Sequence, residues 1–174
     1  MLILIKDTKQ LKFSSLMDIY MESNYRKAAA EHPDLSVNEA LFLIENDFYH
    51  YLKYVFFPAS GIYYAIWEEQ GQWVSALRME PYMDGMLLTG LETHPDHRTK
   101  GFAGMLIQHT LEQLPPGTKV YSHIDKANSG SLRVHSRSGF VKLLTYAAYI
   151  DGRVDDRSVT MLYTRGQGKM FVCQ

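Results

Sequence analysis

The chain has 174 residues, of which 46% are hydrophobic and 13% aromatic. This length and composition fit a single domain over residues 1–174 and exclude a chain that is disordered throughout. Lys and Arg total 18 against 19 Asp and Glu, so the net charge of −1 provides no overall field for binding nucleic acid or an anionic membrane. The single cysteine, Cys173, excludes an intrachain disulfide and a multi-cysteine zinc site, and it favours a reducing, cytoplasmic setting.

The N-terminal third predicts a strand followed by two helices. Residues 1–5 are apolar but too few for a signal peptide or a membrane span, so we expect a first strand there. Ser36 and Glu39 have the spacing of a capping box, and the apolar run behind them predicts a helix that continues to about residue 55. The charged, alanine-rich segment 25–34 is expected to be a surface connection between the two helices.

The middle of the chain predicts three antiparallel strands. Residues 62–67 and 73–77 are rich in β-branched and aromatic residues and flank a short glycine-containing segment, which is typical of a hairpin. An Asp-Gly pair at 84–85 marks a second turn before a strand over 86–93. The later elements are expected in the order helix, strand, helix, strand and strand, over residues 102–114, 118–124, 128–138, 143–151 and 158–164. Residues 166–174 are expected to form a loosely ordered tail.

The clearest functional signal is a basic, glycine-containing loop that leads from the strand over 86–93 into the helix over 102–114. The first turn of a helix has free backbone N–H groups and the positive end of the helix dipole, so it is suited to binding phosphate. Gly101 and Gly104 remove side chains where a pyrophosphate must approach closely, and Arg98 and Lys100 add positive charge. The loop matches neither the P-loop nor the dinucleotide-binding glycine pattern.

Residues 98–103, Arg-Thr-Lys-Gly-Phe-Ala, resemble the Arg/Gln-x-x-Gly-x-Gly/Ala signature of the GNAT superfamily of acyl-CoA-dependent N-acyltransferases. Residues 128–140 are similar to that family's second motif, an asparagine and a helix closed by Gly-Phe. The resemblance covers residues 60–165 well and the N-terminal third by element order. It implies an α/β fold of the α+β type, with about seven strands in a mostly antiparallel, twisted sheet and about four helices. The fourth and fifth strands of that sheet would splay apart.

The resemblance also implies the cofactor and its position. Acetyl-CoA would enter the V between the strands over 86–93 and 118–124, with its pantetheine arm paired against the first of them. Backbone N–H groups of residues 98–104 would hold the pyrophosphate. The residues implied to contact acetyl-CoA are Leu91, Thr93, Arg98, Thr99, Lys100, Gly101, Phe102, Ala103, Gly104, Asn128, Ser131 and His135.

Members of this family transfer the acyl group by direct attack of an amine in a ternary complex, and two residues are candidates for the proton transfers. His135 stands where the family often has a tyrosine that protonates the departing sulfur, and it shares one helical face with Asn128 and Ser131. It either acts as this general acid or only lines the cofactor slot. Glu92, at the end of the fourth strand, is the candidate general base or amine-positioning group.

Three further features leave alternatives open. Gly90 marks a candidate bulge, so strand alternation does not fix the face that Glu92 occupies, and Glu80 is a weaker candidate base. His94 and His97 lack further ligands at a convincing spacing, so no metal site is expected. Cys173 is a poor nucleophile candidate because it lies in the expected tail.

The sequence therefore predicts an acetyl-CoA-dependent N-acetyltransferase that acts on a primary amine of a small molecule or on an amino terminus. A non-catalytic acyl-CoA-binding sensor is the alternative from another class, because the cofactor loop supports both. A nucleotide-binding domain would need a base and ribose pocket that the sequence does not locate. The residues do not define the oligomeric state, although a homodimer is common in families of this kind.

Overall fold

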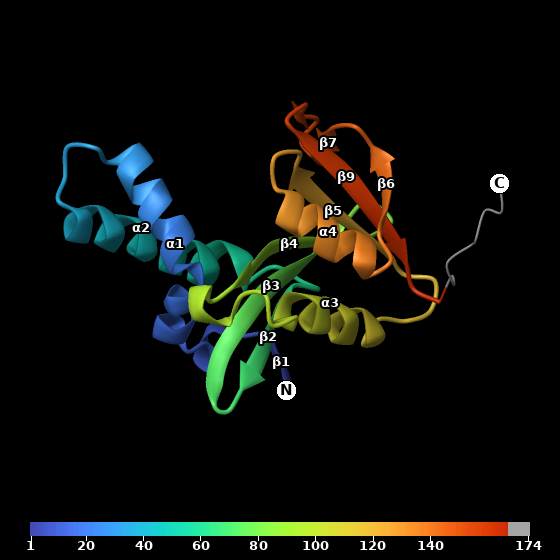
Figure 1. Ribbon diagram of the computed structural model, residues 1–174, viewed down its shortest axis with the longest axis horizontal. Coiled ribbons are helices and arrows are strands. Elements are labelled where there is room, and N and C mark those ends of the chain that lie inside the picture. The colour runs from blue at the N-terminus through green and yellow to red at the C-terminus, as the bar shows by residue number, and fades with distance from the viewer. Residues whose placement is uncertain (167–174) are drawn as a thin grey trace.

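The computed structural model describes residues 1–166. A seven-stranded sheet in the order β1-β2-β3-β4-β5-β9-β6 forms the centre of the molecule, and β7 and β8 pair separately (Figure 1). The helices are α1 Phe13–Glu31, α2 Val37–Tyr51, α3 Phe102–Glu112 and α4 Ser129–Arg137. The strands are β1 Leu2–Ile5, β2 Tyr63–Glu69, β3 Gln72–Tyr82, β4 Gly85–Thr93, β5 Lys119–Asp125, β6 Val141–Leu144, β7 Ala147–Ala148, β8 Val154–Asp155 and β9 Ser158–Thr164.

The sheet is antiparallel except where β4 meets β5. These two strands run parallel and pair only at Met86 with Val120 and at Leu87 with Tyr121. Beyond these pairs they separate, so the predicted splay between the fourth and fifth strands is confirmed. Gly90 has a φ of +60°, and the β3–β4 register shifts opposite it, so the predicted bulge is also present.

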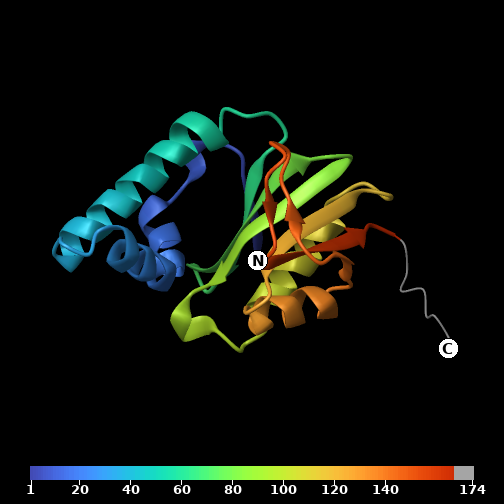
Figure 2. The same cartoon turned by 90° about the horizontal axis from the view of Figure 1, so that it is seen from above.

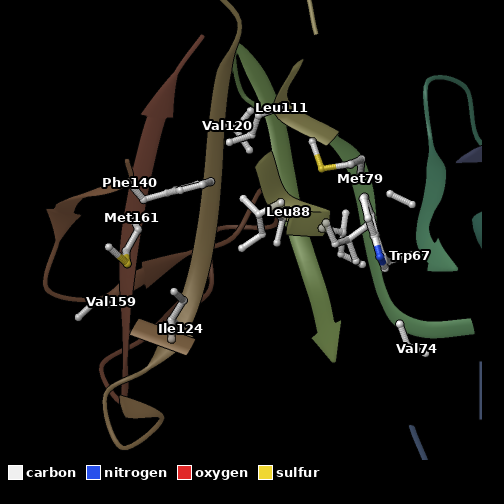
Figure 3. Packing of buried hydrophobic residues seen from close by; sticks show 14 residues of the cluster. Trp67, Val74, Met79, Leu88, Leu111, Val120, Ile124, Phe140, Val159 and Met161 are labelled. Carbon is white, nitrogen blue, oxygen red and sulfur yellow. The ribbon is translucent and has the colours of Figure 1, made fainter. Parts of the chain in front are cut away.

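Two hydrophobic clusters cover the two faces of the sheet. One packs α3 against β2, β3 and β4 and continues across the V to β5 and β9; Figure 3 shows its residues, among them Met79, Leu88 and Ile124. The other packs α1 and the end of α2 against the opposite face of β2 and β3, around Tyr64 and Ala76. Figure 2 shows α1 and α2 on the side of the sheet away from α3 and α4. The cluster that contains α3 therefore joins β2, β3 and β4 to β5 and β9. The V between β4 and β5 stays open where these two strands separate.

The structure corrects two sequence-based expectations. Residues 25–34 are not a connection along most of their length, because α1 continues to Glu31. Alanine is a strong helix former, and Ala28 is buried against α2 beside Ala40 and Ile44. The expected strand over 143–151 is also divided, because β6 ends at Leu144 and β7 belongs to the small hairpin with β8.

Other expectations are confirmed. Ser36 accepts a hydrogen bond from the Glu39 N–H, and the Glu39 carboxylate accepts one from the Ser36 N–H, which completes the capping box. The helix that follows continues past Tyr51 through a π-helical turn, Leu52–Phe56. Within residues 1–166, no helix is long and apolar enough to cross a membrane. The expected loose tail lies, but for residue 166, outside the described residues.

Candidate active site

The V opens into a cavity of about 1170 Å³ at the carboxyl ends of β4 and β5. Its walls come from these strand ends, from the loop that enters α3, from the first turn of α3, from α4 along its length, and from α1. Lys100 and His135 are the two residues predicted to contact acetyl-CoA that do not line it. The predicted residues that do are Leu91, Thr93, Arg98, Thr99, Gly101, Phe102, Ala103, Gly104, Asn128 and Ser131.

The loop before α3 presents backbone donors to this cavity. Thr99 and Gly101 both have positive φ, at +62° and +87°, and Gly101 caps the helix. The N–H of Met105 makes the first hydrogen bond of α3, to the Gly101 carbonyl at 3.1 Å. The N–H groups of residues 102–104 come before it and have no acceptor within the helix. A Cβ placed on Gly101 would meet no heavy atom of the described residues within 4 Å, so the space beside these donors is open.

The basic side chains of the loop are engaged with the protein. Arg98 Nη1 donates to Glu22 Oε2 of α1 at 2.6 Å, and Arg98 Nε donates to the Thr93 carbonyl at 3.2 Å. Lys100 Nζ donates to the Asp96 carbonyl at 2.8 Å. In this arrangement the backbone N–H groups and the helix dipole, rather than these two cations, are the free groups that can bind an anion.

Glu92 lies on the wall of the same cavity, at the end of β4. Burial raises the pKa of the Glu92 carboxyl above its ordinary value. The nearby Ser23 hydroxyl and the positive charges of Arg26 and Arg98 oppose this rise without cancelling it. A carboxylate with a raised pKa is a stronger base than an exposed one, so Glu92 is suited to accept a proton at this position.

His135 is placed differently from the sequence-based expectation. Its side chain is buried, with the residue 1% exposed, and it does not line the cavity. Its Nδ1 lies 2.9 Å from the Ser131 carbonyl, which can only accept, so Nδ1 carries the proton and Nε2 accepts from the Ser122 hydroxyl at 3.1 Å. Burial lowers the pKa of His135, which favours this neutral ring. The imidazole therefore connects α4 to β5, and its role as general acid stays a prediction that this placement does not favour.

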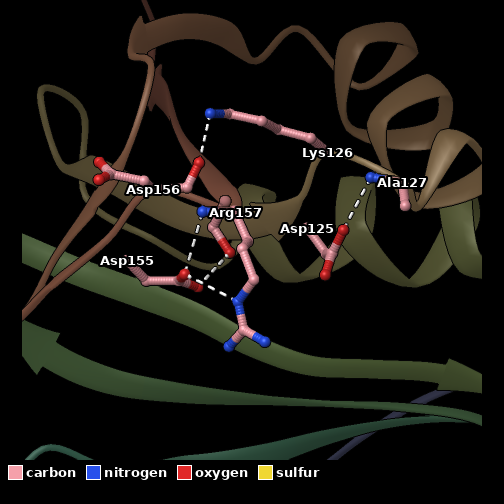
Figure 4. Close-up of polar contacts among 7 residues, drawn as sticks. Asp125, Lys126, Ala127, Asp155, Asp156 and Arg157 are labelled. Carbon is pink, nitrogen blue, oxygen red and sulfur yellow. Dashed lines mark hydrogen bonds and ion pairs between the residues drawn. The ribbon is translucent and has the colours of Figure 1, made fainter.

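Asn128 and Ser131 begin α4 at the cavity wall. Asn128 Oδ1 accepts from the Ser131 N–H at 3.0 Å, as expected for a helix-capping asparagine. The turn before them contacts the turn between β8 and β9, and Figure 4 shows the contact between Lys126 and Asp156. Lys126 Nζ donates to the Asp156 carbonyl, and the Lys126 N–H donates to the Arg157 carbonyl at 2.9 Å.

Among the remaining candidates in the described residues, His97 lines the cavity, and His94 and Glu80 do not. The Glu80 carboxylate lies 4.0 Å from Arg78 Nε. His94 Nδ1 accepts from the Asp96 N–H at 3.2 Å, and no group of three potential metal-binding side chains occurs within residues 1–166. Cys173 lies outside the described residues.

Sequence reasoning missed Glu22 and Arg26, which bring α1 to the cavity wall. Both are charged residues on a helix, a pattern that also describes an ordinary solvated face, and no motif marks them. The ion pair between Glu22 and Arg98 joins residues that are 76 positions apart. Only the folded arrangement therefore shows that α1 belongs to the site.

Comparison with known proteins places this geometry among related folds. The model of the acetyltransferase (GNAT) family matches residues 13–140. The comparison with curated protein sequences finds no significant match. The solved structure of the ribosomal-protein-S18-alanine N-acetyltransferase from Escherichia coli is similar with a TM-score of 0.60, at 15% identity over 100% of both chains.

Two further solved structures share this fold. The PaiA N-acetyltransferase from Thermoplasma acidophilum in complex with coenzyme A has a TM-score of 0.59 and 12% identity, over 94% of this chain and 99% of that one. A chimera of the spermidine N-acetyltransferase SpeG from Vibrio cholerae and hSSAT has a TM-score of 0.56 and 22% identity, over 94% and 95% of the two chains.

Proposed function

Because this chain belongs to the acetyltransferase (GNAT) family, whose members are acyltransferases that use acetyl-CoA, we propose that it acetylates a primary amine by direct attack within a ternary complex. The acceptor is a small molecule or an amino terminus. The solved structures of similar fold include enzymes named for spermidine and for an alanine of a ribosomal protein, so acceptors of both kinds occur on this fold.

One observation carries the proposal: the free N–H groups of α3 and the Glu92 carboxyl face the same cavity. Acetyl-CoA bound with its pyrophosphate at residues 101–104 and its pantetheine arm along the open edge of β4 has its thioester at the strand end, near Glu92. An amine that enters from the other side of the V then meets the thioester beside a carboxylate. Binding of one substrate and activation of the other are thus combined at one place.

The chemistry needs two proton movements. The amine nitrogen loses a proton to Glu92, directly or through a water molecule, and attacks the thioester carbonyl carbon. Backbone N–H groups near Glu92 and Thr93 stabilise the negative charge that develops on the carbonyl oxygen. The C–S bond then breaks, which completes the amide, and the CoA thiolate leaves and takes up a proton from water. Glu92 releases its proton to water before the next turnover.

A panel of amines tests the proposal against the sensor alternative. Both accounts expect acetyl-CoA to bind, but only an enzyme releases free CoA thiol at a rate that depends on an added amine. We expect amine-dependent thiol release and an acetylated product of matching mass. Acetyl-CoA binding without release, across small amines and peptide amino termini, would support the sensor.

The Glu92→Gln variant tests whether Glu92 is the general base or only lines the cavity. We expect kcat/KM for the acceptor to fall at least about 10²-fold, the usual scale for loss of a general base, with the Kd of acetyl-CoA little changed. Glu69→Gln, a change of the same chemistry in the β2–β3 hairpin, should leave both constants unchanged. Equal turnover in the Glu92→Gln variant would remove Glu92 from the chemistry.

A further inference from the structure

Arg78 of β3 is a largely buried cation whose Nε is unpaired among residues 1–166. Its side chain is 19% exposed, and its buried Nε makes no hydrogen bond with any group of these residues. The carboxylate at ion-pair distance is that of Glu80, whose Oε1 lies 4.0 Å from Nε, beyond a hydrogen bond. A buried guanidinium has a high desolvation cost unless its donors are paired, so this site is suited to receive an acceptor.

Three aromatic rings lie around this guanidinium. Its Cζ lies 6.0 Å from the ring centroid of Phe48, 5.6 Å from that of Tyr51 and 5.9 Å from that of Phe56. Such contacts stabilise the cation and restrict its rotation, but the rings provide no hydrogen-bond acceptor of ordinary strength for its N–H groups. A planar guanidinium held in this way is suited to a two-point bond with a carboxylate.

Arg78 also lies on the same face of the sheet as Glu92, the proposed base. Ala76 pairs with Glu92 across β3 and β4, so these two side chains point to the same face. Arg78 lies two residues from Ala76 on β3 and points to that face as well, which α1 covers. The opposite face, where Leu77 and Met79 point, belongs to the cluster that contains α3.

The bulge in β4 brings Arg78, which does not itself line the cavity, next to Gly90. A Cβ placed on Gly90 would lie 3.1 Å from Arg78 Nε and 3.3 Å from Nη2. Gly90 is followed directly by Leu91 and Glu92, which line the cavity. The absence of a side chain at Gly90 leaves room for the guanidinium beside the strand that carries the proposed base.

We propose that Arg78 binds a carboxylate of the acceptor, so that the preferred substrate is an amine that also carries a carboxylate. This inference rests on the proposed acetyltransferase function. The acceptor amine lies beside Glu92, the carboxylate lies against Arg78, and Glu80 holds the guanidinium weakly until the substrate replaces it. Free amino acids and acidic peptide segments share this chemistry.

Matched pairs of acceptors test the proposal. Each pair is an amine with a carboxylate and its carboxamide twin: an α-amino acid, an ω-amino acid, and a short peptide with Glu or Gln at its second position. For the preferred pair, we expect the native enzyme to favour the carboxylate by roughly tenfold or more in kcat/KM. Which pair responds identifies the source of the carboxylate. A native enzyme that favours no carboxylate in any pair overturns the proposal.

Arg78→Met should bring that ratio to about one, by raising KM for the carboxylate and leaving the amide almost unaffected. Lys53→Met is the matched control, because it also removes a cation that lies over aromatic rings, those of Tyr49 and Tyr54, but on an exposed side chain. It should leave the ratio unchanged. If Arg78→Met lowers kcat/KM for acid and amide equally, the arginine is structural and the proposal fails.

Glu80→Gln keeps the test decisive if Arg78→Met does not fold. Removing the competing carboxylate should raise the acid-to-amide ratio about threefold or more; an unchanged ratio counts against the proposal. Binding of N-acetylated amino acids and their amides to the CoA complex, measured by calorimetry, reports carboxylate recognition without turnover. Tight binding of the acid without acetylation of any amine would refute the proposed function alone, and equal binding of acid and amide would refute the role of Arg78 alone.

Discussion

A comparison of Gly101 with Gly117 separates two effects of a side chain at Gly101: loss of cofactor binding and backbone strain. Both have a left-handed φ, +87° and +83°, and a Cβ on either would meet no described heavy atom within 4 Å. Valine at either position should therefore cost about 1–2 kcal/mol of folding stability. Only Gly101 lines the cavity, so Gly101→Val should also raise the Kd of acetyl-CoA at least tenfold, or about 1.4 kcal/mol.

Calorimetric titration and thermal unfolding of both variants measure these effects. The Gly117→Val variant should lose stability and keep its cofactor affinity. If Gly101→Val binds acetyl-CoA as the native protein does, the pyrophosphate lies elsewhere. If both variants lose affinity equally, the effect of Gly101 arises from strain alone.

His135 provides a prediction about pH. Burial lowers the pKa of the folded imidazole, whereas in the unfolded chain it titrates near 6.5. The unfolded state therefore binds more protons between these two values, and the stability contributed by the neutral ring is present above pH 6.5 and lost as pH falls below it. His135→Gln should make the melting temperature less dependent on pH between about 7.5 and 5.5.

His123→Gln is a useful comparison, because burial also lowers the pKa of His123 while the charge of Asp155 opposes the shift. It should flatten the same profile less. Turnover of the His135→Gln variant tests the sequence-based prediction of a general acid, which requires roughly a hundredfold loss of kcat at saturating acetyl-CoA. Because the ring is buried away from the cavity, we expect a loss below tenfold. A hundredfold loss would restore the general-acid role.

The residues found from the sequence are those that lie next to a recognisable motif. The loop glycines, Glu92 and Asn128 are all predicted in this way, and the structure places them around one cavity. Arg78 and Glu22 were missed, because in the sequence an arginine on a strand and a glutamate on a helix look like ordinary surface residues. Their roles depend on contacts with segments far along the chain.

At the scale of elements, α3 contains a glycine, Gly104, that lowers the stability of the helix. Gly104 lies in the first turn, and a Cβ there would meet Val134 Cγ2 at 3.7 Å, an ordinary contact. Alanine should therefore stabilise the helix by up to about 1 kcal/mol. Gly104→Ala should therefore raise the melting temperature. The added methyl group would also project into the cavity, so the same change should weaken acetyl-CoA binding severalfold.

Gly130→Ala is the comparison, because Gly130 occupies the first turn of α4 on the same wall, with 3.7 Å between an added Cβ and Asn128 Oδ1. If the pyrophosphate lies on α3, this change should affect the cofactor Kd less than Gly104→Ala does. An equal or larger loss of affinity in Gly130→Ala would move the phosphates toward α4.

Elements with strong local signals could be predicted from the sequence, and elements set by distant contacts could not. The capping box at Ser36 and the turn signal at Gly85 located α2 and β4. The extension of α1 to Glu31 depends on packing against α2, and the break after Leu144 depends on pairing with β9. The Thr160 hydroxyl donates to the Tyr146 carbonyl at 2.7 Å, a contact that fixes the break and leaves no sequence signal.

At the scale of the whole molecule, the sheet consists of two halves that are joined only where β4 and β5 pair. β1 to β4 form one half, and β5, β9 and β6 form the other, with two residue pairs between β4 and β5. The hydrophobic cluster that contains α3 continues across both halves, so they share one core. Beyond Leu87 the facing edge groups of β4 have no strand partner in β5. A ligand that lies along this edge therefore completes the sheet as well as occupying a cavity.

Hydrogen exchange with acetyl-CoA tests this role of the cofactor as a substitute strand. Amide protons in residues 88–93 that face β5 should exchange more slowly in the complex, because the pantetheine arm provides acceptors that β5 does not. The N–H groups of residues 101–104 should be protected as well, by the pyrophosphate. Binding to the folded state alone should add about 2.7 kcal/mol of stability at a concentration a hundredfold above Kd. Free CoA should give the same pattern, because the acetyl group makes neither contact. Protection at α3 without protection at β4 would mean that the cofactor binds the loop but does not enter the V, and the proposed approach of the amine to Glu92 would then lose its basis.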